Sequence, residues 1–136
     1  MDSENKIIPY NTQYTDKEDI DALVDLMESG AFLTCGPKVT EFEEKICEYT
    51  GAKYGVAVSN GTAALHIACL TLGLKKGDEV IVPAITFAAS SNCVLYCGAK
   101  PVFCDIEENT LNLDCDKIEE LITDKTKAII AVDMAG

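Results

Sequence analysis

The chain has 136 residues, 48% of them hydrophobic, and a formal net charge of -12 at pH 7. The length suits one domain or part of a larger one, and the apolar content is sufficient for a packed core, which excludes a disordered segment. The negative charge argues against nucleic acid and anionic membranes as partners, because phosphate groups attract clustered Lys and Arg. No apolar run reaches the roughly 18 residues of a membrane span.

The first third of the chain predicts an arm and two helices. Residues 1–14 are polar around the extended stretch "KIIPY" and are interpreted as an arm. Thr15 and Glu18 have the spacing of a capping box, and the apolar residues that follow recur at helical spacing until Gly30. Pro37 is expected to start a second helix that ends at Gly51.

From residue 54 onward, short apolar stretches alternate with helical ones. Strands are expected over 54–59 ("YGVAVS"), 79–83, 100–106 and 127–134, and helices over 62–72, over 88–97 and from Asp114 or Asp116 to Ile122. This order predicts βαβ units with right-handed crossovers, and therefore an α/β fold with a mostly parallel sheet and helices on both faces. Ligands of such sheets bind at the carboxyl ends of the strands.

The first strand end carries the sequence "SNGT", from Ser59 to Thr62. Gly61 lets the backbone approach a ligand, and the helix start leaves the N–H groups of Gly61, Thr62 and Ala63 without intrahelical partners. These donors, the helix dipole and the Thr62 hydroxyl are suited to a phosphate group. One glycine is not GxGxxG and GK[ST] is absent, so a terminal monophosphate matches best. An ordinary helix cap by Ser59 or Asn60 is the alternative.

Phe87 follows the second strand end, in "PAITFAAS". An aromatic side chain at this place can stack on a flat heteroaromatic ring, and a core phenylalanine is the alternative. A phosphate cup and a ring platform on successive strand ends together describe a site for a planar phosphorylated cofactor.

The cysteines and the histidine give little support to a metal site. The seven cysteines include no CxxC pair, the count is odd and no secretory signal is visible, which predicts free thiols in the cytoplasm. Cys93 and Cys97 could share a helix face and bind a metal, but His66 is the only histidine and no ligand cluster completes a site, so packing is favoured.

Several stretches form a recognisable set. They are Gly36-Pro37, Phe42-Glu43 and the segments 60–65, 77–83, 86–87, 98–103 and 126–130. Through them the chain resembles the DegT/DnrJ/EryC1/StrS nucleotide-sugar aminotransferases, which have the aspartate-aminotransferase fold (fold type I), from about Ile8 to Gly136. The resemblance implies that residues 15–136 are the N-terminal part of the large domain that binds pyridoxal 5'-phosphate (PLP), with that domain incomplete at Gly136.

The resemblance also implies residue roles. The turn Gly61-Thr62-Ala63 matches the one that holds the PLP phosphate, and Phe87 matches the aromatic residue that stacks on the pyridine ring. Tyr10 and Thr34 are implied as substrate-facing residues, with plain surface positions as the alternative.

The implied activity is transfer of an amino group from an amino acid, usually glutamate, to a nucleotide-linked keto sugar. This reaction serves amino-sugar and cell-surface polysaccharide biosynthesis and is expected in a cytoplasmic homodimer. Asp133 stands where many family members carry His, and with Ala135-Gly136 it is similar to the branch that acts in pseudaminic acid biosynthesis. Asp133 is not expected to pair with the pyridine nitrogen.

The family's Schiff-base lysine, pyridine-pairing aspartate and phosphate-binding serine are expected beyond Gly136. No catalytic residue is therefore assigned within the chain, which is expected to be inactive alone. Two other functions stay open: a PLP- or PMP-dependent sugar dehydratase, in which His replaces the lysine, and a non-catalytic module that binds a nucleotide or sugar phosphate. A flavodoxin-like domain is disfavoured.

Overall fold

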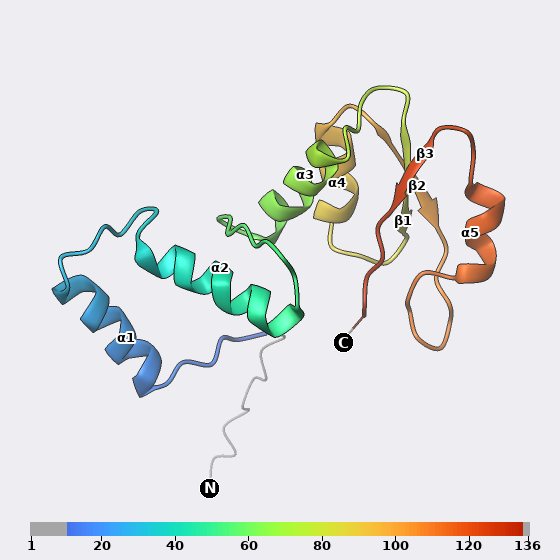
Figure 1. Ribbon diagram of the computed structural model, residues 1–136. Helices are drawn as coiled ribbons and strands as arrows, with labels where there is room; N and C mark the ends of the chain where they lie inside the picture. Colours follow the sequence, from blue (N-terminus) through green and yellow to red (C-terminus); the bar gives the residue numbers. More distant parts are fainter. Residues whose placement is uncertain (1–10, 135–136) are drawn as a thin grey trace, which may run out of the picture. The chain divides into compact units, whose positions relative to one another are not determined.

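The computed structural model describes residues 11–134 (Figure 1), so most of the predicted arm lies outside the described residues. The chain forms two compact units that divide between Ala57 and Val58. The first contains two helices, and the second contains a parallel sheet with three helices.

The first helix of the chain, α1, spans Lys17–Glu28 and begins with a capping box. The box lies one residue later than predicted: Asp16, not Thr15, is the N-cap, and its carboxylate accepts from the N–H groups of Glu18 and Asp19. Asp19 closes the box by accepting from the Asp16 N–H at 3.0 Å. An Asp occupies both the N-cap and the N3 position of the box, so the spacing from Thr15 to Glu18 was misleading.

The second helix, α2, spans Pro37–Thr50 and has the predicted start and end. Pro37 occupies the first turn, where a missing N–H costs nothing. Gly51 ends the helix in the left-handed conformation, with φ of 73°, and donates its N–H to the Cys47 carbonyl at 2.9 Å.

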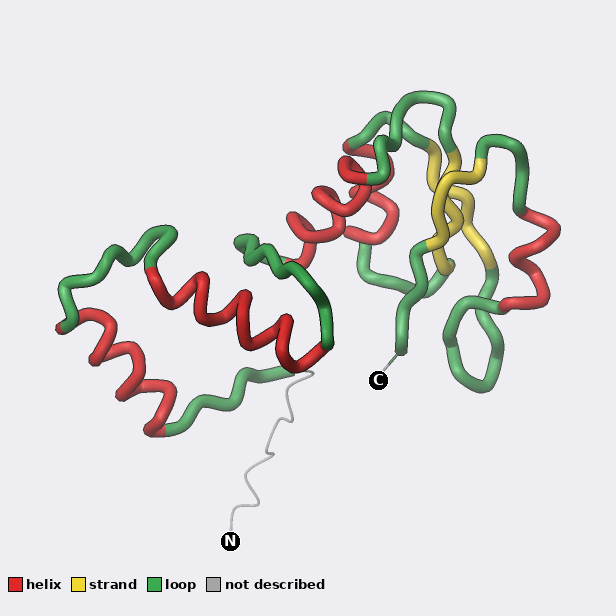
Figure 2. Tube along the Cα trace, in the orientation of Figure 1, coloured by secondary structure: helices red, strands yellow, loops and turns green. Residues whose placement is uncertain are grey.

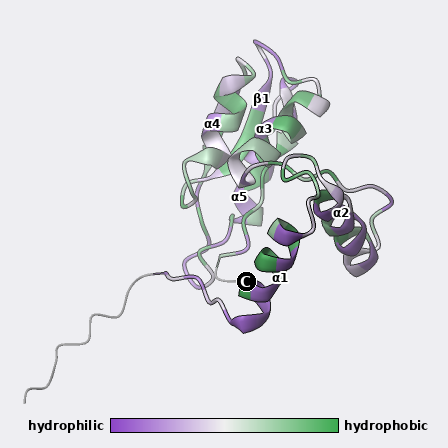
Figure 3. Cartoon of the chain, turned by 90° about the vertical axis from the view of Figure 1, so that its left-hand side faces the viewer, coloured by the Kyte–Doolittle hydropathy of each residue, from purple (hydrophilic) through white to green (hydrophobic). Residues whose placement is uncertain are grey.

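The apolar side chains of α1 and α2 are largely open to solvent. Neither helix contains a buried residue, and both carry hydrophobic as well as hydrophilic positions in Figure 3. On α1, Leu23 and Met27 are 64% and 67% exposed, and on α2 Phe42 is 57% exposed. Exposed apolar side chains in such number are typical of a surface that packs against something else.

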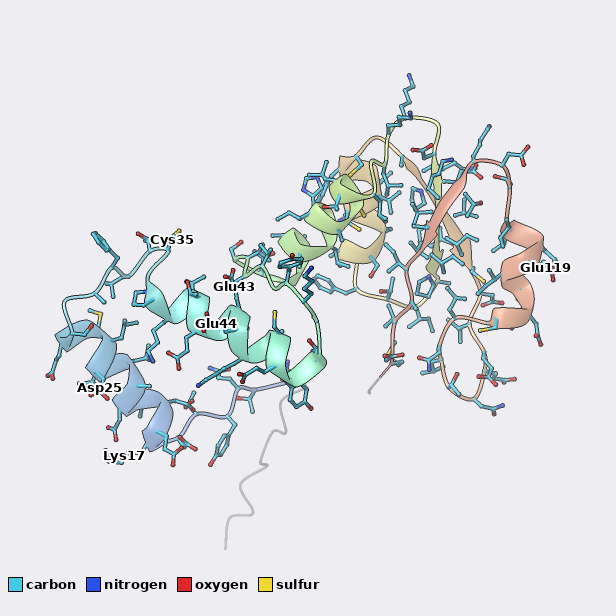
Figure 4. All side chains as sticks on the ribbon, viewed as in Figure 1. Lys17, Asp25, Cys35, Glu43, Glu44 and Glu119 are labelled. Atoms are coloured by element: carbon cyan, nitrogen blue, oxygen red, sulfur yellow. The ribbon has the colours of Figure 1, made fainter. Side chains whose placement is uncertain are left out.

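The strand predicted over residues 54–59 is wrong. The segment is a loop between α2 and the next helix, α3 (Gly61–Thr71), as Figure 2 shows, and Tyr54 and Val56 are 78% and 77% exposed. A strand needs a neighbour to take up its backbone hydrogen bonds, and among residues 11–134 this segment pairs with none. Instead, the Ala57 N–H donates to the carboxylate of Glu43 on α2 at 2.7 Å (Figure 4 labels Glu43).

Gly55 brings this loop close to α2. A Cβ at Gly55 would lie 3.0 Å from both the Cys47 Sγ and the Glu43 carbonyl oxygen, so glycine permits an approach that other residues would strain. The loop is therefore held against α2 although it forms no strand.

The sheet of the second unit has three parallel strands in the order β2-β1-β3, not the four predicted. They are β1 (Glu79–Pro83), β2 (Lys100–Cys104) and β3 (Thr126–Ile129). The central strand β1 pairs Ile81 with Val102 on one side and with Ile129 on the other. The third strand ends well before residue 134, which the sequence pattern had included.

Helices cover both faces of the sheet, as predicted. They are α3 (Gly61–Thr71), α4 (Ala89–Tyr96) and α5 (Cys115–Leu121). The connections β1-α4-β2 and β2-α5-β3 cross the sheet in opposite directions, so crossovers of one hand place α4 and α5 on opposite faces. Figure 1 shows α3 and α4 on one side and α5 on the other.

The core lies between β1 and the helices α3 and α4, which pack on each other. It consists of apolar side chains from these elements and the turns beside them: Cys69, Leu74, Val80, Val82, Cys93, Val94 and Ala99. Every residue of β1 is buried, as is typical of the central strand of a parallel sheet. The loops at the carboxyl edge of the sheet leave from this buried centre.

Candidate functional site

The three strands end at one edge of the sheet because they are parallel. Their last residues are Pro83, Cys104 and Ile129. The helix α4 starts beyond Pro83, and α3, which leads into the amino end of β1, starts near the same edge as α4 in Figure 1. Two helix N-termini therefore lie at the edge where ligands of parallel sheets bind.

Asn60 caps α3 and uses one of the predicted phosphate donors. Its backbone is extended, and its Oδ1 accepts the N–H of Ala63 at 2.9 Å, while its carbonyl accepts the N–H of Ala64 at 3.1 Å. Within residues 11–134 the structure gives no acceptor for the N–H groups of Gly61 and Thr62. The alternative of a helix cap by Asn60 is therefore confirmed, and the N–H groups of Gly61 and Thr62 remain beside the cap.

Gly61 leaves room for a ligand at the start of α3. A Cβ placed on Gly61 meets nothing within 4 Å, so the space beside its backbone is open. The first turn of α3 contains no acidic residue to repel an anion. Two N–H donors, an open approach and the positive end of a helix dipole fit a phosphate group.

Phe87 lies in the loop between β1 and α4 and is 78% exposed. Phe87 is not among the buried residues that the structure describes. An exposed aromatic ring at the carboxyl edge of a sheet is available to a flat ligand.

Thr34 and Tyr10 are the two residues predicted to face the substrate. Thr34 is exposed in the loop between α1 and α2, which belongs to the first compact unit. Tyr10 lies outside the described residues. Their assignment as substrate-facing residues stays a prediction.

Sequence patterns missed a contact that fixes the chain beyond β3. Asn112 Oδ1 accepts the N–H of Met134 at 2.8 Å. The two residues are far apart in the sequence, and neither belongs to a recognisable spacing pattern, so only the fold could reveal the contact. The contact holds the segment after β3, including the exposed Asp133, next to the loop that follows β2.

An ion-pair cluster follows the end of β2. Lys117 on α5 donates to Asp105 Oδ2 at 3.0 Å and lies 3.4 Å from Asp114 Oδ2. The Lys117 hydrogen bond lowers the pKa of Asp105, and the same contact raises the pKa of Lys117. Both partners are well exposed, so the pair orients the loop more than it stabilises the fold.

A cavity of about 230 Å³ lies beside α5, but its lining is acidic. Its residues are Glu107, Leu113, Asp114, Cys115 and Asp116. Three carboxylates would repel a phosphate group, so this cavity does not compete with the start of α3 as an anion site.

The two lysines on the strands, Lys100 and Lys127, lie at or next to the amino ends of β2 and β3 and not at the carboxyl edge. Lys100 binds Glu79 at 3.0 Å, at the amino ends of β1 and β2. Lys53 lies 5.1 Å from the Tyr54 ring centroid, and Lys127 is exposed on β3.

His66 packs edge-on against Tyr96, with ring centroids 5.2 Å apart. Cys93 is buried in the core, where its Sγ donates to the Ser90 carbonyl. Within the described part of the chain, no three His, Cys, Asp or Glu side chains gather as metal ligands. None of the helices described between residues 11 and 134 is both long and apolar enough to cross a bilayer.

Comparison with known proteins places residues 13–136 within the model of the DegT/DnrJ/EryC1/StrS aminotransferase family. Over 132 residues the chain is 43% identical to the spore coat polysaccharide biosynthesis protein SpsC of Bacillus subtilis (strain 168), covering 97% of this chain and 34% of that protein. It is also 43% identical, with the same coverage, to the UDP-4-amino-4-deoxy-L-arabinose--oxoglutarate aminotransferase of Shewanella sediminis.

A solved structure is similar over most of the chain. The PLP form of the putative sugar aminotransferase Spr1654 from Streptococcus pneumoniae matches with a TM-score of 0.88 and 40% identity, covering 95% of this chain and 33% of that one. The chain thus spans about a third of the length of the proteins it matches.

Proposed function

Because this chain belongs to the DegT/DnrJ/EryC1/StrS aminotransferase family, we propose that it supplies the phosphate-binding and ring-stacking part of a PLP-dependent nucleotide-sugar aminotransferase. The observation that carries the proposal is the placement of two features at one edge of the sheet. The open N–H groups of Gly61 and Thr62 start α3 near this edge, and the exposed Phe87 follows β1, which ends there.

These residues fit PLP, a flat ring with a terminal phosphate. The N–H groups of Gly61 and Thr62 bind the phosphate, and the Thr62 hydroxyl adds a donor. Ala63 joins this set only if its N–H is shared with or released from Asn60. Phe87 covers one face of the ring and excludes water from it. When bound, PLP acts as an electron sink for bonds at the amino-bearing carbon.

The substrates follow from the relatives as part of the proposal. The Shewanella protein is named for a UDP-linked amino sugar and for oxoglutarate, which supports a nucleotide-linked keto sugar and glutamate as the amino acceptor and donor. The name of the Bacillus relative supports a role in polysaccharide biosynthesis. The net charge of -12 means that the nucleotide phosphates need local donors, not the overall field.

The catalytic amine is proposed to come from a lysine outside residues 1–136. Lys100 begins β2 and binds Glu79 at the start of β1, so its amine lies at the amino edge of the sheet and not at the carboxyl edge. The chain's own residues therefore bind and orient the cofactor, and they do not carry out the proton transfers.

The remaining parts of the proposal concern organisation. Residues 15–136 are proposed as part of the PLP-binding large domain, preceded by an arm of residues 1–14. A homodimer is supported by the exposed apolar side chains of α1, such as Leu23 and Met27. A cytoplasmic location is supported by cysteines that all stay free in the structure.

The test measures binding and amino transfer separately. PLP is titrated into the purified protein, and the amide signals of Gly61 and Thr62 are followed by NMR with Gly73, at the other end of α3, as the control. We expect the first two signals to shift with PLP and with inorganic phosphate, and the third to stay in place.

Amino transfer is measured with the full-length protein, glutamate and a 4-keto nucleotide sugar. Formation of oxoglutarate and amino sugar in equal amounts is expected. Loss of the sugar hydroxyl without amino transfer would identify a dehydratase, and phosphate binding with neither reaction would identify a binding module. Either result would overturn the proposed function.

A further inference from the structure

Two hydroxyl groups form a hydrogen bond around Phe87. The Thr86 Oγ1 and the Ser90 Oγ lie 2.7 Å apart, one just before Phe87 and the other in the first turn of α4. The Ser90 N–H also donates to the Phe87 carbonyl at 3.0 Å. Ser90 thus contacts both Phe87 and the residue before it.

Ser90 and Phe87 differ sharply in burial. Ser90 is 5% exposed, whereas the Phe87 side chain is 78% exposed. Little of the protein packs on the Phe87 ring, so the position of the ring depends on the backbone that carries it. A buried hydroxyl must have a hydrogen-bond partner, and Thr86 supplies it for Ser90.

The Thr86–Ser90 hydrogen bond lies in the middle of the loop that connects β1 to α4. Before the loop, the Ala84 N–H donates to the Cys104 carbonyl at 2.8 Å, which ties the end of β1 to β2. After the loop, α4 starts without a side-chain cap at Ala88. Between these two fixed points, the Thr86–Ser90 pair is the side-chain contact that restrains the backbone of Phe87.

We propose that Ser90 is a positioning residue whose buried hydroxyl, bonded to Thr86, holds Phe87 ready to stack on a flat heteroaromatic ligand. The proposal rests on the proposed function, because it assigns a cause to the placement of the stacking residue. Holding an exposed ring in place before binding lowers the entropy lost when the ligand arrives. The resulting gain in affinity concerns the ring of the ligand and not its phosphate, which is proposed to bind at the start of α3.

This separation distinguishes positioning from a merely structural role. If Ser90 only stabilised α4, its removal would lower the melting temperature and affect ring and phosphate binding to the same degree. If Ser90 positions Phe87, its removal weakens PLP binding and leaves inorganic phosphate binding unchanged.

The experiment compares four variants in the purified protein. Ser90→Ala removes the buried hydroxyl, and Thr86→Val removes its partner from a half-buried site while keeping the shape. Thr86→Ser keeps the hydroxyl as the conservative variant. Ser91→Ala is the matched control, because the neighbouring Ser91 hydroxyl donates to the Ala88 carbonyl and takes no part in the Thr86–Ser90 pair.

PLP affinity is measured by equilibrium dialysis, and phosphate affinity by the Gly61 amide shift with inorganic phosphate. We expect Ser90→Ala and Thr86→Val each to weaken PLP binding about fivefold, the size of one lost hydrogen bond, with less than about a twofold change for phosphate. Thr86→Ser and Ser91→Ala should stay within about twofold of the wild type for both ligands. Should Ser90→Ala fail to fold, the two Thr86 variants decide the question.

Two outcomes would overturn the proposal, and they differ. PLP binding that is insensitive to Ser90→Ala and Thr86→Val, or equal losses for PLP and phosphate, would remove the positioning role and leave the proposed function intact. A wild-type protein that binds no PLP would remove the proposed function and this proposal with it.

Discussion

The ammonium group of Lys100 lies 3.0 Å from the Glu79 Oε1, and the pair joins the first residues of β2 and β1. Thr123 donates its hydroxyl to the other Glu79 oxygen at 2.8 Å, from the turn that leads into β3. One carboxylate therefore ties together the amino ends of all three strands. The Thr123 hydrogen bond, followed by that of Lys100, holds the pKa of Glu79 below its usual value.

Glu79→Gln should reduce stability at neutral pH and have little effect in acid. Because the pKa of Glu79 is lowered in the folded state, its contribution is present above the ordinary glutamate pKa of about 4.3 and is lost as the pH falls through the folded value. Urea unfolding at pH 7 and pH 3 measures this difference. Glu119→Gln, at an exposed position on α5 (Figure 4), is the matched control and should leave the free energy of unfolding unchanged at both pH values. An equal loss for Glu79→Gln at both pH values would contradict the role of the charge.

Gly61→Val should abolish close approach of a phosphate without unfolding α3. The fold has space for the added side chain, since a Cβ there meets nothing within 4 Å, so the cost falls on the ligand. We expect PLP affinity to fall at least about tenfold, or about 1.4 kcal/mol, as read from visible absorbance after dialysis. Ala68→Val places the same side chain at an exposed position later in α3 and should retain PLP. Unchanged retention in Gly61→Val would refute the phosphate assignment.

Phe87→Ala should weaken PLP binding more than Phe87→Leu does. Leu keeps much of the apolar area but loses the aromatic face, and stacking contributes ~1 kcal/mol beyond area, or about fivefold in affinity. The two variants therefore divide the loss into an aromatic part and an area part. Phe32→Ala, at a phenylalanine that is 83% exposed between α1 and α2, serves as the control. Equal PLP affinity in wild type and Phe87→Ala, with circular dichroism unchanged, would show that the ring does not stack.

The seven thiols should react in an order set by burial. Desolvation in the core, with the neighbouring Cys93 thiol, raises the pKa of Cys69 to about 12, whereas Cys35 and Cys115 are exposed. The thiolate is the reactive form, so a disulfide reagent at pH 8 should modify Cys35 and Cys115 first and Cys69 only after unfolding in urea. Peptide mass mapping at successive times gives the order. Early modification of Cys69 would mean that the packing of α3 on α4 is looser than described.

The elements fixed by local sequence were predictable. Pro37 and Gly51 bound α2, and Asp114, one of the two caps considered for α5, is the residue that caps it. Such signals depend on backbone conformation and on donors within a few residues, so they need no knowledge of the fold. The capping box of α1 shows the limit: with Thr15 and Asp16 adjacent, the pattern could not tell which residue would be the cap.

What depends on a distant partner was not predictable. The apolar stretch over residues 54–59 has the composition of a strand, but no neighbouring strand is present among residues 11–134. The contact between Asn112 and Met134 and the Thr86–Ser90 pair follow no spacing rule either, because they depend on where loops meet. At the candidate site, the sequence indicated Gly61 and Phe87 and offered Ser59 or Asn60 as a cap, but it could not tell whether a cap or a ligand would use the Ala63 N–H.

The strand order β2-β1-β3 has a consequence for how the sheet is assembled during synthesis. The central strand leaves the ribosome first, and each later strand emerges after a helix and joins a free side of β1. Every pairing therefore joins a new strand to one already made, and each closes a loop whose entropy cost grows only slowly with length. The sheet can grow outward from its most buried strand, so the apolar residues of β1 are the first to be buried.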